Sequence, residues 1–218
     1  MVRRLLANYV SGMTSTEHTE PPFTRTGDDG TTLLADLTQV SKTDPRLVAY
    51  ASCEEASASI GSAIALSETL GDDVITVLAR VQNDLFDLGS DLTNPTTQHD
   101  ENQLRIDDAY TERLEEACEE YHRTLPGQRT FIVPGGTVAG SLLHNARAVV
   151  RRAERAVWTA LETYDDISPV IARYLNRLAD LLFVLARKAN VEHGDMAWQP
   201  GLSARHGLFP APPPPSEE

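Results

Sequence analysis

The stretch Thr137–Tyr164, which reads TVAGSLLHNARAVVRRAERAVWTALETY, decides the fold class of this chain. It contains no proline and a single glycine, and its apolar residues recur at the three- and four-residue spacing of one helix face. Those apolar positions are Val138, Leu142, Ala146, Val149, Ala153, Ala156 and Leu161. The spacing predicts one long helix whose apolar stripe packs against other helices.

Four further helices are predicted around this one. Asp72 and Asp73 stand where a carboxylate would cap a helix, and Ser168 before Pro169 is a cap followed by a first-turn proline. The predicted segments are the Ala-rich Leu47–Ser67, a periodic run from Asp72 to Leu88, Asp107–Arg123 and a run from Ser168 to Asn190. With no convincing strand pair and no internal repeat, the expected fold is an all-α five-helix bundle.

The helical segments define the expected domain, with different compositions on either side. We expect residues 1–22 to be a flexible leader, residues 23–190 to form the bundle domain, and residues 191–218 to be a Pro-rich, largely disordered tail. Within the domain, residues 24–45 are rich in Gly, Thr and Asp with weak periodicity, which indicates an ordered loop ahead of the first helix.

Composition excludes several classes of function. The 19 Lys plus Arg and 32 Asp plus Glu give a formal charge of −13, which argues against a general nucleic-acid binder. Every long helical segment is interrupted by charge, so no membrane span is expected, and the apolar stretch near the start breaks at Asn8, short of a signal peptide. The two cysteines, Cys53 and Cys118, show no C-x-x-C spacing, which favours buried thiols in a reducing, cytoplasmic compartment.

A glycine- and threonine-rich segment, Thr24–Thr32 (TRTGDDGTT), is a candidate anion site together with Lys42. Its two glycines let backbone N–H groups turn into one concavity, while hydroxyls, Arg25 and Lys42 add donors, so the segment could hold a polyphosphate. It matches no standard nucleotide fingerprint, and the same residues are common in plain turns. Asp28 and Asp29 would repel phosphate unless they cap a turn or approach it through Mg²⁺.

The long helix gathers positive charge in an acidic protein. Its four-residue spacing places Arg147, Arg151 and Arg155 along one side with Glu154 between them, whereas Arg152 points well round the cylinder. Arginine forks match phosphate oxygens, so an anionic ligand is one interpretation. A solvated face with internal ion pairs is the other.

Three polar features of the remaining helices have competing interpretations. Asn176, one turn before Asp180, could contact a base or ribose, although on its own a single Asn here favours a capping or inter-helix hydrogen bond. Glu119-x-x-His122 matches one element of di-iron bundle proteins, but no second copy falls in a predicted helix, so we set that class aside. His144 is interpreted as a satisfied or exposed histidine rather than a ligand.

Taken in order, these pieces resemble the ATP:cob(I)alamin adenosyltransferases of the PduO type. The motifs are FTRTGDDGTT at residues 23–32, VSKTDPR at 40–46, LFDLGSDL at 85–92, FIVPGG at 131–136, RAVVRRAER at 147–155 and YLNRLADLLFVLAR at 174–187. The resemblance covers Phe23 to Asn190. It implies a five-helix bundle assembled as a homotrimer, with active sites between subunits, that transfers the adenosyl group of ATP to the cobalt of cob(I)alamin.

The resemblance also implies roles for individual residues. ATP would contact Thr24, Arg25, Thr26, Gly27, Gly30, Thr31, Thr32, Leu33 and Lys42, and, from the helical side, Arg151, Arg152, Ala153, Glu154, Arg155 and Asn176. Arg151 is the expected catalytic residue. Phe131 would lie beside the lower face of the corrin and keep the nucleotide base off cobalt. Mg²⁺ would accompany ATP, and the protein itself would hold no resident metal.

An acid–arginine pair across the subunit interface is the point where the chain departs from the resemblance. Arg147 would pair with an acid of the first helix, but the family's V-D-E-L-N is here Cys53-Glu54-Glu55-Ala56-Ser57. The acid would be Glu54, one methylene longer than aspartate. The expected partners are a reductase that supplies Co(I) and an enzyme that uses adenosylcobalamin. The alternative function is a non-catalytic trimer that senses ATP or cobalamin, or delivers the cofactor.

Overall fold

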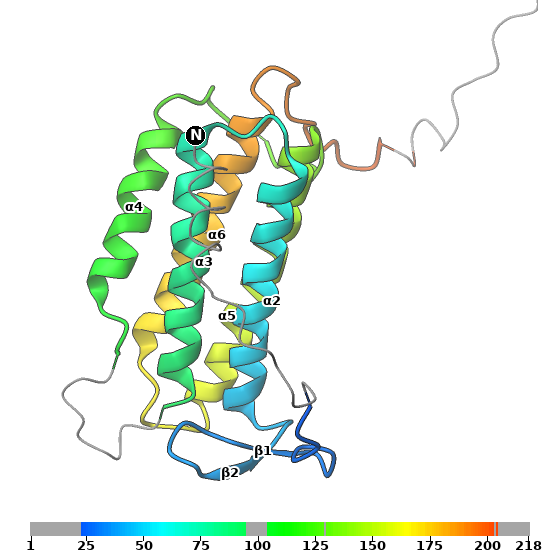
Figure 1. The fold of residues 1–218 in the computed structure, drawn as a ribbon. Helices are drawn as coiled ribbons and strands as arrows, with labels where there is room; N and C mark the ends of the chain where they lie inside the picture. The colour runs from blue at the N-terminus through cyan, green and yellow to red at the C-terminus, as the bar shows by residue number, and fades with distance from the viewer. Residues whose placement is uncertain (1–22, 95–103, 129, 203, 205–218) are drawn as a thin grey trace, which may run out of the picture.

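The computed structural model describes residues 23–94, 104–128, 130–202 and 204, and these form five helices and one two-stranded hairpin (Figure 1). The elements are β1 (Thr31–Leu33), β2 (Gln39–Ser41), α2 (Pro45–Leu66), α3 (Asp72–Leu92), α4 (Asp108–His122), α5 (Val138–Leu161) and α6 (Pro169–Ala189). The predicted five-helix bundle is therefore confirmed. The expected leader and most of the proline-rich tail lie outside the described residues.

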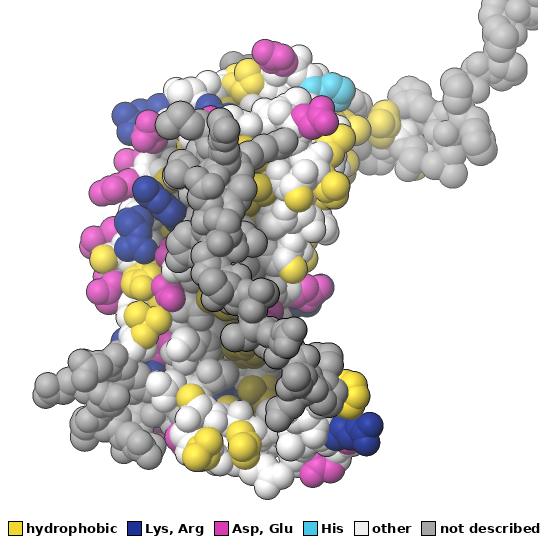
Figure 2. Space-filling view, in the orientation of Figure 1, with side chains coloured by type: hydrophobic (Ala, Val, Ile, Leu, Met, Phe, Trp, Pro, Cys, Tyr) yellow, Lys and Arg dark blue, Asp and Glu magenta, His cyan; other side chains and the backbone are white. Residues whose placement is uncertain are grey.

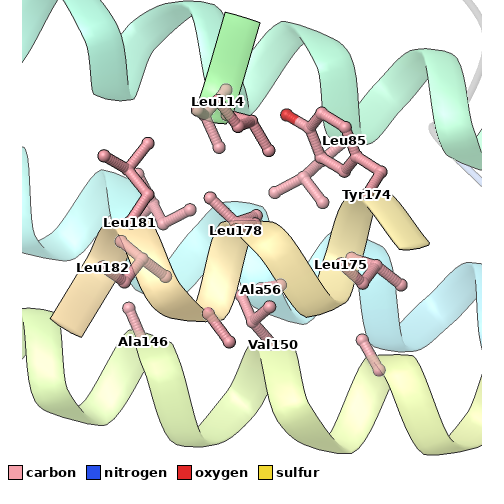
Figure 3. Close-up of a cluster of buried hydrophobic side chains, with 14 of the residues drawn as sticks. Ala56, Leu85, Leu114, Ala146, Val150, Tyr174, Leu175, Leu178, Leu181 and Leu182 are labelled. Carbon is pink, nitrogen blue, oxygen red and sulfur yellow. The ribbon is translucent and has the colours of Figure 1, made fainter. Parts of the chain in front are cut away.

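The long helix α5 is central to the packing, because it lies against both α2 and α6, while α3 packs on α2 and α4 on α6. Figure 3 shows Leu175, Leu178 and Leu182 of α6 in one cluster of hydrophobic side chains with Ala146 and Val150 of α5. These side chains are buried, and alanines on α2 and α5 let the helix backbones approach closely. The predicted helix is therefore confirmed, but its predicted core face is only partly correct: Ala146, Val149 and Ala153 are buried, whereas Val138 is 63% exposed.

Helix starts agree with the sequence pattern for α4, α5 and α6, whereas α2 begins at Pro45 instead of the predicted Leu47 and α3 lacks its predicted cap. Asp107, Thr137 and Ser168 each accept a hydrogen bond from a backbone N–H of the first turn of α4, α5 and α6. The cap predicted for α3 is wrong, because Gly71 occupies that position without a side-chain bond. Asp72 and Asp73 lie inside the first turn, where a carboxylate interacts favourably with the positive end of the helix dipole.

The hairpin corrects the expectation that the chain has no strand pair. β1 and β2 are antiparallel, with Thr31 opposite Ser41 and Leu33 opposite Gln39. Each strand has three residues, too few for an alternating pattern to stand out. The turn between them places Leu37, not glycine, at a positive φ of 68°, so the usual turn signal is missing.

The hairpin is joined to the bundle through a buried arginine at the start of α2. Arg46 is 2% exposed; its guanidinium donates to the Asp166 carboxylate at 2.6 Å and to the Leu92 carbonyl at 2.8 Å, and lies 4.3 Å from the Tyr164 ring centre. Tyr164 in turn donates to Asp44, the N-cap of α2, at 2.5 Å. These contacts hold the end of β2 against the ends of α3 and α5.

Residues 191–202, which sequence analysis placed in the tail, contact the bundle at its other end. Arg187, 4% exposed, donates to Asp195 at 3.0 Å and to the Pro126 carbonyl at 2.8 Å. Asn190 donates to the Gly135 carbonyl at 2.9 Å and accepts from the Thr137 N–H at 3.0 Å. The ordered contacts thus extend beyond the expected boundary at residue 190.

Two remaining expectations concern the cysteines and the possibility of a membrane-spanning helix. Cys53 is buried, which raises the pKa of its thiol to about 12, and Cys118 is half-buried with a raised pKa from the same cause. Both thiols are free. Across the described ranges, none of the helices combines the length and the apolar character that crossing a membrane requires.

Candidate functional site

The loop before β1 and the residue after β2 come together at one end of the bundle. The Lys42 ammonium donates to the Gly27 carbonyl at 2.6 Å, and the Lys42 N–H donates to the Gly30 carbonyl at 2.9 Å. Gly30 has φ +83°, a conformation that favours glycine, and a Cβ on Gly27 would lie 2.8 Å from the lysine nitrogen, so glycine at 27 lets the ammonium approach the loop. The structure therefore brings the glycine-rich segment and Lys42 together as the sequence suggested.

Asp29 supports this loop as a turn cap. Its Oδ1 accepts from the Thr31 hydroxyl at 2.7 Å and from the Thr31 N–H at 3.0 Å. These hydrogen bonds lower the pKa of Asp29, so the carboxylate stays ionised while it caps the turn. Asp28 is exposed beside it. Of the two options that the sequence left for these acids, Asp29 takes the turn cap.

The basic face of α5 consists of Arg147, Arg151 and Arg155. Arg151 and Arg155 are exposed, and within the described residues neither forms an ion pair. Arg147 is half-buried over the Phe183 ring, and its Nε is buried with no hydrogen-bond partner among the described residues. Burial and the nearby Arg151 lower the pKa of Arg147, while Asp180 opposes the shift. The three arginines together form a positively charged face that an anion would neutralise.

The two flanks of this face contact different helices. On one side, Glu154 accepts from the Asn176 amide of α6 at 3.2 Å and from the Trp158 indole at 3.4 Å. On the other side, Arg152 pairs with Glu55 of α2. Asn176 therefore makes the inter-helix bond that the sequence left open, and its amide stays exposed at the edge of the basic face. Arg152 points toward α2 and away from Asn176, and Ala153 is buried between them.

Glu54 and Arg147 do not pair within one protomer. Glu54 is exposed on α2 and is hydrogen-bonded to Tyr50, whose pKa is raised first by burial and then by the Glu54 charge. Arg147 lies over Phe183 of α6. A contact between Glu54 and Arg147 would have to come from two copies of the chain.

The connector before α5, which carries Phe131, lies at the opposite end of the bundle from the hairpin (Figure 1). The ring of Phe131 is 76% exposed and packs edge-on against Trp198, with ring centres 6.1 Å apart. The 24 residues of α5 separate the two ends, which at about 1.5 Å per residue is about 36 Å. Arg151 lies between them, near the middle of α5. One protomer therefore does not bring the hairpin and Phe131 together.

Two residues beside the basic face were not assigned to it from sequence: Phe183 was not considered, and His144 was interpreted only as a satisfied or exposed histidine. Phe183 lies under Arg147, and the His144 ring packs against Phe183 with ring centres 6.1 Å apart. His144 is buried, so the pKa of its ring is lowered and the ring is neutral at pH 7. Helical spacing was the available signal, since His144 precedes Arg151 by two turns and Phe183 follows Asn176 by two turns.

The remaining candidate, Glu119 with His122, is exposed on α4. Acidic and basic side chains alternate over that side of the molecule (Figure 2), as on a solvated helix face. Within the described ranges, no group of three or more His, Cys, Asp or Glu side chains could hold a metal ion.

These observations define a helical-bundle protein with a glycine- and threonine-rich hairpin region at one end, an arginine face along its longest helix and exposed aromatic rings at the other end. The family model described as cobalamin adenosyltransferase matches residues 22–189. The chain belongs to the cobalamin adenosyltransferase family.

Characterised relatives and solved structures agree with this assignment. The chain is 52% identical over 182 residues to the corrinoid adenosyltransferase of Mycobacterium tuberculosis, covering 82% of this chain and 93% of that protein. It is 37% identical over 174 residues to the corrinoid adenosyltransferase of Bacillus subtilis, covering 79% and 88%. A phenylalanine-to-alanine variant of the PduO-type ATP:corrinoid adenosyltransferase from Lactobacillus reuteri, complexed with cobalamin and ATP, superposes with a TM-score of 0.76 at 32% identity, covering 82% of this chain and 99% of that one.

Proposed function

We propose that this chain transfers the 5′-deoxyadenosyl group of ATP to cob(I)alamin, or to cob(I)yrinic acid a,c-diamide, and releases triphosphate. ATP-dependent adenosylation of a corrinoid is the activity that the family assignment supports, and the alternative of a non-catalytic sensor or cofactor carrier is not favoured. The observation that carries the proposal is the arginine face of Arg147 and Arg151, which forms no ion pair among the described residues and lies beside the Glu154–Asn176 bond.

The triphosphate is held by two sets of groups. The first is the hairpin set of Thr24–Gly27, Gly30–Leu33 and Lys42, which the bonds from Lys42 to the Gly27 and Gly30 carbonyls hold close together. The second is Arg151–Arg155 with Asn176 on α5 and α6. Asp28 is the exposed carboxylate of the loop and can approach a Mg²⁺ ion carried by the phosphate oxygens, which are the ligands this cation prefers.

The two sets come from different protomers of a homotrimer in this proposal. Within one protomer the hairpin and Phe131 lie at opposite ends of α5, so a nucleotide held by the hairpin cannot present its sugar to a corrinoid beside the same protomer's Phe131. The Nε of Arg147 has no hydrogen-bond partner among the described residues, and Glu54 is exposed. Both observations support a contact between Arg147 of one copy and Glu54 of another.

The protein must position the two substrates and stabilise the negative charge that develops on the leaving group. Cob(I)alamin is itself the nucleophile: its cobalt attacks C5′ of ATP, a Co–C bond forms, the C5′–O bond breaks, and its electron pair leaves with triphosphate. No general base is needed. Arg151, with Lys42, stabilises the negative charge that grows on the leaving group, an effect typically worth about 2–4 kcal/mol per charged donor in the transition state.

Phe131 serves the other substrate. Its exposed ring offers an apolar surface to the lower face of the corrin, and a lower axial base that is excluded from cobalt leaves a four-coordinate metal that is easier to reduce. The reaction then requires a reductase that delivers Co(I) and an enzyme that accepts the product. A cytoplasmic location suits the free thiols of Cys53 and Cys118.

The direct test is to mix the protein with Mg-ATP and chemically reduced cobalamin under anaerobic conditions. The expected product has the absorbance of a light-sensitive Co–C bond and forms together with triphosphate. Binding of ATP or cobalamin without formation of this product would contradict the enzyme proposal and support the sensor or carrier alternative.

A further inference from the structure

The segment after α6 forms a two-stranded contact with the connector that carries Phe131. Ile132 and Ala197 pair as an antiparallel bridge, the Trp198 N–H donates to the Phe131 carbonyl at 2.8 Å, and the Val133 N–H donates to the Met196 carbonyl at 2.9 Å. We call residues 195–198 the aromatic latch. The latch lies beyond residue 189, where the family match ends.

Buried polar groups fix the base of the latch. The Asp195 carboxylate accepts from Arg187 at 3.0 Å and from the Asn190 amide at 3.3 Å. Arg187 and Asn190 are 4% and 2% exposed, so their bonds are shielded from water. Arg187 also donates to the Pro126 carbonyl at 2.8 Å, and it thus ties the latch to the beginning of the same connector.

The connector is shaped to receive these groups. Asn190 donates to Gly135 and accepts from both the N–H and the hydroxyl of Thr137. A Cβ on Gly136, which has φ +102°, would lie 2.5 Å from the Asn190 amide. The Pro-Gly-Gly sequence therefore lets the connector lie directly on the polar group that also holds Asp195.

Phe131 itself has little other support. Its side chain is 76% exposed, and its ring contact within the described residues is the edge-on packing against Trp198. An exposed aromatic side chain without a neighbour exchanges between rotamers, whereas an edge-to-face partner favours one of them. The polar base positions the backbone, and Trp198 selects the orientation of the ring.

We propose that Trp198 is a positioning residue for Phe131, and that the aromatic latch thereby controls how completely the lower base of cobalamin is excluded from cobalt. This inference rests on the proposed role of Phe131. It adds a residue outside the matched family segment to the determinants of corrinoid selectivity. Trp198 need not touch the reacting atoms.

The test compares Trp198→Ala with Phe131→Ala, using Met196→Ala as the matched control, since Met196 contributes only its backbone to the bridge. The first measurement is the base-off fraction, which is the share of cob(II)alamin that loses its lower ligand on the Mg-ATP-saturated protein, read by electron paramagnetic resonance. The second is the rate of adenosyl transfer to cobalamin and to a corrinoid that lacks the lower base. We expect Trp198→Ala to lower the base-off fraction and the cobalamin rate about two- to tenfold, the range of an edge-to-face pair. KM for ATP and the rate with the base-free corrinoid stay unchanged.

Trp198→Phe keeps an aromatic partner and should restore the base-off fraction, which a loss of folding in Trp198→Ala would not explain. Because the Trp198 side chain is half exposed, the thermal unfolding midpoint of Trp198→Ala should stay near that of Met196→Ala. A wild-type base-off fraction in Trp198→Ala overturns the inference, whatever Phe131→Ala does. A wild-type fraction in Phe131→Ala overturns the proposed role of Phe131 separately.

Discussion

The hairpin end of the bundle is made of hydroxyls, glycines and a lysine on short turns, whereas the other end exposes aromatic rings on a two-segment bridge. At the hairpin end, Lys42 and Asp29 bond to backbone and hydroxyl groups of the loop. At the aromatic end, Phe131 and Trp198 pack edge-on above a buried polar network. The first suits a polyanion and the second an apolar macrocycle, so the two ends should respond to different substrates.

The largest effect is expected from the residue between the two ends. Arg151→Ala should lower turnover by about a hundredfold or more, because it removes a preorganised positive charge from the leaving triphosphate. The loss should be equal for cobalamin and for a base-free corrinoid, and the oligomeric state should not change. Steady-state kinetics and light scattering measure both, with the exposed Arg123→Ala as control. Wild-type turnover in Arg151→Ala would mean that the triphosphate binds elsewhere.

The aromatic end should produce a selective effect. Phe131→Ala is expected to slow transfer to cobalamin about tenfold more than transfer to a corrinoid without the lower base, because only the former has a ligand to displace. The control is Phe86→Ala, because Phe86 is another exposed phenylalanine and lies on α3. Equal losses with both corrinoids would remove the distinction between the two ends.

The hairpin end should instead affect the nucleotide. Gly27→Ala places a methyl group 2.8 Å from the Lys42 ammonium, which the flexible side chain can avoid only by leaving its bond to the Gly27 carbonyl. We expect KM for ATP to rise about three- to tenfold, the net cost of about one ordinary hydrogen bond, with little change in the melting temperature. KM for cobalamin, measured in the same assay, should be unaffected. A change confined to the corrinoid would contradict the assignment of this end.

The smallest expected effect concerns His144. Its pKa lies below the ordinary 6.5, first because of burial and then because of Arg147, with Asp195 opposing the shift. The unfolded chain therefore binds the proton more tightly, and the stability contributed by the neutral ring is present above pH 6.5 and lost as pH falls through the folded-state pKa. In urea titrations from pH 7.5 to 5, His144→Gln should lose less unfolding free energy than wild type. Parallel curves would show that His144 is not buried neutral.

The helices could be predicted from sequence because their signals are local and repeated. The apolar stripe of α5 and the Ser168–Pro169 start of α6 each depend on residues within a few turns. The hairpin could not be predicted in this way, because its strands have three residues each and its turn places Leu37 at a positive φ. Local information did not suffice for a structure that is held by Arg46, far along the chain from its partner Asp166.

The candidate site shows the same division. The Gly27–Lys42 contact and the line of Arg147, Arg151 and Arg155 follow from loop composition and helical spacing. The contact between Trp198 and Phe131 joins segments on either side of two helices, and no local pattern marks it. Sequence reasoning ended the domain at residue 190 because the following prolines suggested a tail, and the residues before them carry the latch.

The central claim is that a hairpin from one protomer and α5 from another build each site, and mixed oligomers test it most directly. Lys42→Ala damages the hairpin half and Arg151→Ala the α5 half, so each variant alone should be nearly inactive. When the two variants are co-expressed in equal amounts, the mixed oligomers should recover about one quarter of wild-type turnover. In that fraction of the shared sites, an intact hairpin from one protomer meets an intact α5 from another. Activity no higher than the mean of the two parents would show that each protomer builds its own site.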